Sequence, residues 1–178
     1  MAEKEKEKTA VEQAGEDLFN FAVDREDIKT FMAHLPEEAD IERSTVEYEL
    51  QILKIIIVGW SLSYFLEDDP IKAPLQELYW KAIHEFSWSL SETTNLMIGQ
   101  GVDYFQAVKD RLDMYVASMD KKPDAQEPAV VIGPEFARSC GNSDDIFTVM
   151  TGSRMCVSAI GSVREYLETL ELKNIKTS

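Results

Sequence analysis

The segment from Leu50 to Leu66 limits the possible folds of this chain more than any other part of the sequence. Lys54 is its only charged residue, and residues 55–66 carry no charge. A helix of this composition is apolar on nearly every side, so it must be surrounded by other helices or by lipid. The segment therefore predicts a central apolar helix over about residues 44–67, with the rest of the chain packed around it.

Two other structures for this segment fit the sequence less well. A transmembrane helix needs about 20 apolar residues and is oriented by flanking Lys and Arg, whereas this uncharged run is 12 residues long and has acidic flanks. The β-branched run Ile55–Val58 favours a strand, but the residues before and within it recur at the helical spacing of about 3.6. Those residues are Ile41, Thr45, Tyr48, Ile52, Ile56, Gly59 and Ser63. We expect a helix, and no membrane-spanning segment.

Length and periodicity extend this prediction to the whole chain. The 178 residues, 44% of them hydrophobic and 29% charged, are typical of one globular domain. Apolar residues recur at helical spacing over residues 9–35, 75–97, 103–119 and 146–170. The sequence predicts an all-α fold, a single-domain bundle of five or six helices over residues 9–178. A charged flexible tail at residues 1–8 precedes it.

Several local signals refine the expected helices. The first helix should bend near Val23–Asp24, where Arg25 falls on its apolar stripe. Ser44 and Glu47 form a possible capping box for the central helix, with a start at Pro36 as the alternative. Asp103 with Gln106 resembles a capping pair at the start of the helix over residues 103–119. Pro134 suits the start of a short helix that ends at Gly141, and Ser143 suits the N-cap of the last helix.

Small residues predict where helices approach closely. Gly59 lies inside the central helix, where a glycine costs about 1 kcal/mol relative to alanine. The last helix carries a small-residue stripe of Gly152, Cys156 and Ala159. We expect this stripe to pack against Gly59.

Composition also limits the classes of partner. The net charge is −15, from 33 acidic and 18 basic residues. Nucleic-acid binding requires Lys and Arg to neutralise phosphates, so we expect no nucleic-acid partner. An acidic surface mainly keeps a protein soluble. It also fits an acidic inhibitor or immunity-type protein that neutralises a basic partner.

The two cysteines, Cys140 and Cys156, lie in apolar helical sequence and form no CxxC pair. A free cysteine in such a context behaves as a small hydrophobic residue. Because no signal peptide is predicted, we expect a reducing, cytoplasmic location.

Trp80, His84 and Trp88 are the strongest candidates for a functional site, because their spacing of four residues places them on one helix face. One hypothesis is a ligand pocket, or a haem site in which His84 supplies the axial nitrogen. The other is a second buried face, covered by another helix or by a second subunit. A lone histidine without further ligands favours the second hypothesis.

Patterns of metal-dependent and nucleophilic catalysis are incomplete. A di-metal bundle needs Glu-x-x-His on two helices, but Lys81 and Phe31 stand three residues before His84 and His34. The acidic clusters lie mostly at helix ends, where capping and solvation explain them. No base is identified for Cys140. We therefore predict no metal site, no cofactor and no catalytic residues, and lean against an enzyme.

Arg154 and Arg164 lie ten residues apart in the last helix, nearly on one face. Arginine is enriched at protein interfaces, although surface ion pairs within this acidic chain are the simpler explanation of these residues. Together these observations favour a non-catalytic cytoplasmic protein that acts through protein contacts and forms a homodimer through the Trp80–His84–Trp88 face. The alternative is a helical bundle, with or without enzymatic activity, that binds a small molecule or haem near the same three residues.

Overall fold

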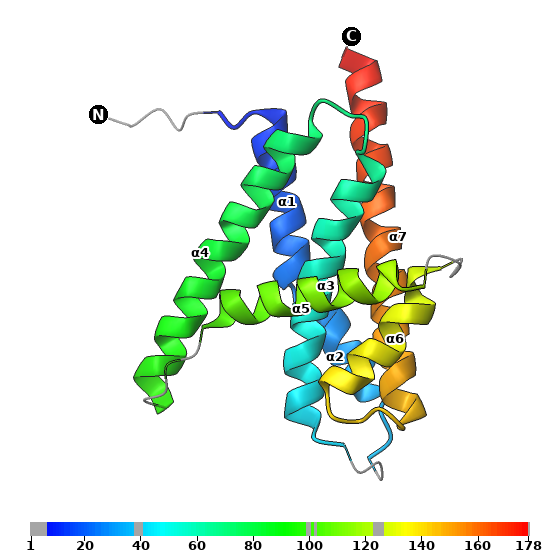
Figure 1. Ribbon diagram of the computed structural model, residues 1–178. Coiled ribbons are helices and arrows are strands. Elements are labelled where there is room, and N and C mark those ends of the chain that lie inside the picture. Colours follow the sequence, from blue (N-terminus) through cyan, green and yellow to red (C-terminus); the bar gives the residue numbers. More distant parts are fainter. Residues whose placement is uncertain (1–6, 38–40, 99–100, 102, 123–126, 178) are drawn as a thin grey trace.

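The computed structural model describes residues 7–37, 41–98, 101, 103–122 and 127–177, and these form an all-α bundle without a β-strand (Figure 1). The predicted fold class is confirmed. The described residues carry seven helical segments, because the first predicted helix is divided in two. The helices are α1 (Ala10–Val23), α2 (Glu26–Ala33), α3 (Arg43–Phe65), α4 (Lys72–Ile98), α5 (Tyr104–Asp120), α6 (Pro128–Ser139) and α7 (Ile146–Thr177).

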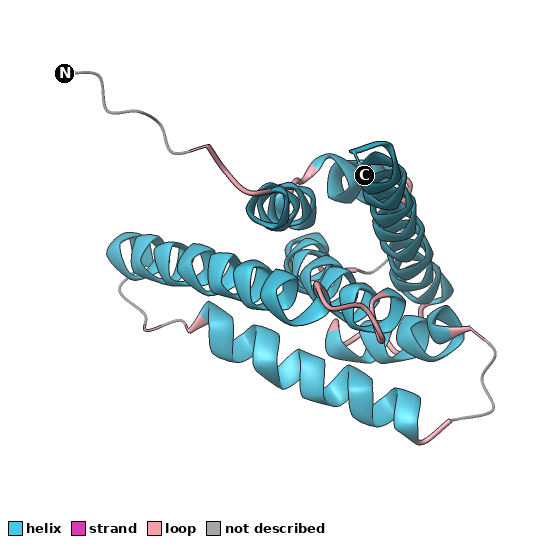
Figure 2. Cartoon of the chain, turned by 90° about the horizontal axis from the view of Figure 1, so that it is seen from above, coloured by secondary structure: helices cyan, strands magenta, loops and turns pink. Residues whose placement is uncertain are grey.

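Helix α3 is the central helix, and its bounds agree with the predicted range of about 44–67 to within two residues. Every residue from Glu49 to Gly59 is buried. Helices α1, α4, α5 and α7 all pack against it. Seen from above, α5 lies outside α4 on one side of the molecule, and α1 and α7 lie on the other (Figure 2). The apolar composition of α3 thus places it where other helices cover each of its faces.

Helix α1 begins with a complete capping box. The Thr9 hydroxyl accepts a hydrogen bond from the Glu12 backbone N–H at 3.2 Å, and the Glu12 carboxylate accepts one from the Thr9 N–H at 2.8 Å. Lys8, in the last position of the predicted tail, pairs with Glu16. Residues 1–6 of that tail lie outside the described residues.

The capping box predicted for α3 is wrong. The helix begins at Arg43, its N-cap is Glu42, and no side chain caps it. Ser44 therefore lies inside the first turn, where its backbone is already helical. Glu47 instead forms an ion pair with Arg25.

The bend expected near Val23–Asp24 is confirmed. Asp24 has extended backbone angles, and its carboxylate accepts a hydrogen bond from the Glu26 N–H at 2.8 Å, which starts α2. The Lys54 ammonium of α3 reaches this corner. It donates to the Asp24 carbonyl at 2.9 Å and lies 3.3 Å from the Asp27 carboxylate and 4.3 Å from the centre of the Phe21 ring.

Two further polar side chains are buried on the same half of α3. Gln51 Nε2 donates to the Ala22 carbonyl at 2.8 Å, at the end of α1. The Glu49 carboxylate is bound by the Arg111 guanidinium of α5. Each of these groups therefore has a partner on another element, as buried polar groups require.

Helix α6 starts earlier than predicted. It runs from Pro128 to Ser139, so Pro134 lies inside the helix rather than at its start. The missing N–H of Pro134 frees the carbonyl of Val130, whose side chain is exposed, so the disruption falls on the solvent side. The chain leaves α6 through Gly141, whose φ of 76° few other residues adopt.

The close contacts at glycines differ from the predicted pairing. Gly59 does not face the small-residue stripe of α7; a Cβ there would lie 2.3 Å from Cζ2 of Trp80 in α4. Gly152 of that stripe instead faces the Phe136 ring of α6; a Cβ there would lie 2.6 Å from Cδ1 of Phe136. Each glycine makes room for an aromatic ring, where the sequence predicted contact between two backbones.

Helix α7 begins at Ile146, and its cap is Asp145 rather than the predicted Ser143. The Asp145 carboxylate accepts hydrogen bonds from the Thr148 N–H at 2.8 Å and the Thr148 hydroxyl at 2.7 Å. By length and composition alone, Ile146–Glu171 is apolar enough to span a membrane. Core helices of soluble proteins pass the same test, and α7 packs along α3 and α6, so this is weak evidence for a span.

Candidate functional site

The predicted Trp80–His84–Trp88 stripe is not a continuous face. The Trp80 ring is half-buried and covers Gly59 and the edge of Tyr79. His84 is exposed and meets the Phe105 ring of α5 edge-on, with a centroid distance of 4.7 Å. Trp88 is left 60% exposed. Only the first of the three residues belongs to the contacts within the bundle core.

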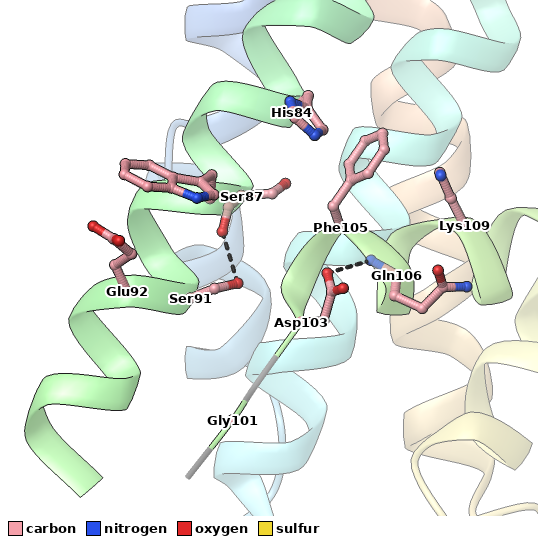
Figure 3. Close-up of a pocket in the computed structure, with 10 residues that line it drawn as sticks. His84, Ser87, Ser91, Glu92, Gly101, Asp103, Phe105, Gln106 and Lys109 are labelled. Atoms are coloured by element: carbon pink, nitrogen blue, oxygen red, sulfur yellow. Dashed lines mark hydrogen bonds between the residues drawn. The ribbon is translucent and has the colours of Figure 1, made fainter. Parts of the chain in front are cut away.

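His84 and Trp88 do line a groove between α4 and the start of α5, with a volume of about 640 Å³. Figure 3 shows the groove, with His84 above and the Asp103 turn below. Its wall is mixed, since the lining includes hydroxyl, amide, carboxylate and ammonium groups. The lining residues are His84, Ser87, Trp88, Ser91, Glu92, Gly101, Asp103, Phe105, Gln106 and Lys109.

Hydrogen bonds fix the floor of this groove. The Ser91 hydroxyl donates to the Ser87 carbonyl at 2.9 Å (Figure 3). It also accepts from the Tyr104 N–H at 3.0 Å, which joins α4 to the first turn of α5. Asp103 caps α5 by accepting from the Gln106 N–H at 3.0 Å. The predicted Asp103–Gln106 capping pair is thereby confirmed, and it holds Phe105 against His84.

The groove does not assemble a catalytic pair. Among the described residues, the His84 ring makes no hydrogen bond to a carboxylate or hydroxyl that would orient it as a base. No three His, Cys, Asp or Glu side chains gather to hold a metal ion in the part of the chain that the structure describes.

A second cavity lies behind this groove, and sequence reasoning missed it. Its volume is about 630 Å³, its wall is mostly apolar, and it shares Ser91 with the groove. It is lined by Val23, Arg25, Tyr48, Gln51, Phe86, Leu90, Ser91 and Tyr104. These residues come from the α1–α2 corner, α3, α4 and α5. No short motif connects them, so only the fold brings them together.

Tyr104 is the residue of this cavity with the most unusual environment. It is only 5% exposed, and its hydroxyl has no hydrogen-bond partner among the described residues. The Tyr48 and Phe86 rings meet its ring edge-on, with centroids at 5.8 Å and 6.4 Å. Burial, and secondarily Tyr48, raise the pKa of Tyr104 far above its usual value. The hydroxyl therefore remains a neutral donor at every physiological pH.

The two candidate arginines lie elsewhere. Arg154 and Arg164 are both exposed on α7, and neither forms an ion pair with a described residue. Neither lines the groove or the cavity. Near Arg154, the same helix exposes four large apolar side chains, which are Ile146, Phe147, Met150 and Val157. We call these four residues the α7 face.

Both cysteines are buried free thiols, as their apolar context predicted. Burial raises the pKa of each thiol to about 12. Neither thiol ionises near neutral pH, so neither is a nucleophile in this structure.

Comparison of the chain with models of protein families, with curated proteins and with solved structures gave no match.

Proposed function

We propose that this chain is a non-catalytic cytoplasmic protein that acts through protein contacts, and that the α7 face joins two copies. The exposure of the α7 face carries the proposal. Its four side chains are between 41% and 60% exposed and lie within about three turns of one helix. Monomeric proteins rarely keep such a contiguous apolar surface in water, because covering it is favourable.

A second copy is the occupant that we propose for this face. Homodimers are mostly two-fold, and in a two-fold pair the same surface patch of each copy meets the other. An antiparallel pair centred on the α7 face therefore lets the apolar side chains of each copy cover those of its partner. No acidic side chain belongs to this face, although the chain as a whole is acidic.

The structure changes which surface we assign to this contact. The sequence predicted the Trp80–His84–Trp88 face, but Trp80 packs on Gly59 and Phe105 covers one side of His84. Trp88 alone is a smaller apolar surface than the α7 face. It remains the natural control, because it lies on α4, across the bundle from α7 (Figure 1).

Light scattering coupled to size exclusion, at micromolar concentrations, tests the proposal. We expect the wild type to be a dimer, Val157→Arg to shift it to monomer, and Trp88→Ala to leave it a dimer. Circular dichroism checks that both variants remain helical. Wild-type monomer across this range would overturn the proposal. A dimer lost only in Trp88→Ala would return the interface to α4.

A small-molecule function has its own supporting observation, which is the apolar cavity around Tyr104. The groove at His84 and Trp88, where the sequence placed a ligand, supports this function less well because it is open and mixed in polarity. By contrast, the hypothesis of an acidic inhibitor still rests on the net charge alone.

A further inference from the structure

The cavity around Tyr104 has walls that are held in place by specific contacts between helices. Its walls come from helix segments fixed by the Gln51 hydrogen bond to Ala22, by Ser91 bonding to Tyr104, and by the packing of Phe86. Its volume of about 630 Å³ falls within the range of sites that enclose small molecules, about 300–1,000 Å³. Such sites combine a mainly apolar wall with a few polar groups, as this one does.

The Tyr104 hydroxyl indicates what the cavity lacks. A buried hydroxyl without a partner destabilises the folded state, so native proteins nearly always supply one. Among the described residues, three other buried side-chain atoms share this condition, but they belong to Ser61, Tyr115 and Asn142, which do not line the cavity. The hydroxyl itself is covered, so a ligand in the cavity whose acceptor is to satisfy Tyr104 must displace a neighbouring side chain.

The charges near the cavity select a neutral ligand. Arg25 at its edge is already paired with Glu47, and the buried Glu49 nearby is already paired with Arg111. An anionic ligand would compete with Glu47 for Arg25 in a chain of net charge −15. A cationic ligand would meet Arg25 without an unpaired carboxylate in the lining. Neither charge would be compensated, and burying it would be costly.

We propose that this cavity binds a neutral, largely apolar molecule with one oxygen acceptor, such as a ketone or an ester, and that Tyr104 donates the hydrogen bond that orients it. Phe86, Leu90 and Val23 then cover the apolar body of the ligand. Tyr48 is 40% exposed, lines the cavity and packs edge-on against the Tyr104 ring, so it is the side chain that we expect to move when the ligand reaches the hydroxyl. This site goes beyond the proposed protein contact and lies on another part of the bundle.

A fluorescent naphthyl ketone, 6-propionyl-2-(dimethylamino)naphthalene, is a suitable probe. It is neutral and apolar with one carbonyl, and its emission shifts to the red when that carbonyl accepts a hydrogen bond. The matched anionic probe is 8-anilinonaphthalene-1-sulfonate, which has a similar apolar body. We expect the folded wild-type protein to bind the ketone more tightly than the sulfonate.

Two matched variants assign the hydrogen bond. Tyr104→Phe removes only the hydroxyl, and we expect it to weaken ketone binding about three- to tenfold, the range of one neutral hydrogen bond, and to shift the emission of the bound probe to the blue. Tyr115→Phe removes another buried hydroxyl without a partner, outside the cavity, and we expect it to change neither quantity. Circular dichroism confirms that both variants are folded.

Four results would overturn the proposal. The first is that the folded wild type does not bind the ketone. The second is that Tyr104→Phe alters neither the affinity nor the emission. The third is that Tyr115→Phe alters them equally, which would indicate a general loosening of the bundle. The last is that the sulfonate binds as tightly as the ketone, which would rule out selection of a neutral ligand.

Discussion

The Arg111 guanidinium of α5 forms a bidentate ion pair with the Glu49 carboxylate of α3. Arg111 Nε donates to Glu49 Oε2 at 2.9 Å, and Nη2 donates to Oε1 at 2.7 Å. The Glu49 side chain is 4% exposed and that of Arg111 is 30% exposed. The hydrogen bond to Glu49 is also the main reason that the pKa of Arg111 is raised. The Glu49 carboxylate is thus buried inside the bundle, while the Arg111 side chain extends to the surface.

Removal of Arg111 should therefore cost far more than removal of an exposed arginine. Arg111→Met leaves the Glu49 carboxylate buried without its partner, and we expect the free energy of unfolding to fall by about 3 kcal/mol. Arg138→Met breaks the exposed pair with Glu135, and we expect it to change the free energy of unfolding by less than about 1 kcal/mol. Urea unfolding measures both.

The double variant Glu49→Met/Arg111→Met separates the pair from its burial. It removes both charges, so we expect it to be more stable than Arg111→Met alone. Equal losses in the Arg111→Met and Arg138→Met variants would show that Glu49 is hydrated and not enclosed.

Gly59→Ala should destabilise the bundle, although alanine is the better helix former. The new methyl group would lie 2.3 Å from Cζ2 of Trp80, so the Trp80 ring must move, and we expect a loss of about 1–3 kcal/mol. The new methyl group of Gly161→Ala in α7 would meet no atom within 4 Å. We expect this variant to raise the free energy of unfolding by up to about 1 kcal/mol. Thermal unfolding, followed by circular dichroism at one protein concentration, compares the two. An unchanged Tm for Gly59→Ala would mean that Trp80 is not packed there.

The two thiols should be unreactive in the folded protein and should make it less stable at alkaline pH. Because the pKa of each is raised from 9.0 to about 12, the folded state keeps protons that the unfolded state releases. The stabilising effect is complete below pH 9 and is lost as the pH rises from 9 to 12.

Ellman's reagent and urea unfolding check this prediction. We expect labelling of both cysteines at pH 8 only when urea unfolds the chain. We also expect the free energy of unfolding to decline less steeply between pH 8 and pH 10 in the variant Cys140→Ala/Cys156→Ala. Rapid labelling of the folded protein at pH 8 would contradict the burial of these residues.

The sequence was sufficient to predict features that depend on local periodicity. The apolar run before Leu66 identified α3, and the bend at Asp24 and the Asp103 cap followed from residues adjacent in the chain. The wrong predictions of helix caps concerned competition between local options. Ser44 and Ser143 each stood near a helix start, but α3 begins at Arg43 and α7 at Ile146, so Ser44 lies inside the first turn and Asp145 is the cap.

The candidate site was harder to predict, because its decisive contacts join distant segments. The spacing of Trp80, His84 and Trp88 correctly placed them on one helix, but it did not reveal that Gly59 makes room for Trp80 or that Phe105 reaches His84. The Tyr104 cavity needs residues 23, 48, 86 and 104 together. The spacing of residues within one helix does not show which residues of the other helices lie beside them.

Three of the buried polar side chains of α3, those of Glu49, Gln51 and Lys54, give the bundle a defined alignment that its apolar residues do not. A helix covered with isoleucine, leucine and valine could slide by one turn, about 5.4 Å, against similar neighbours and still bury its surface. Such a shift would separate Glu49 from Arg111, Gln51 from Ala22 and Lys54 from Asp24 at once. We infer that the apolar positions of α3 tolerate exchange among aliphatic residues. The three polar positions instead determine which of several packing arrangements, all burying similar apolar surface, the helices adopt.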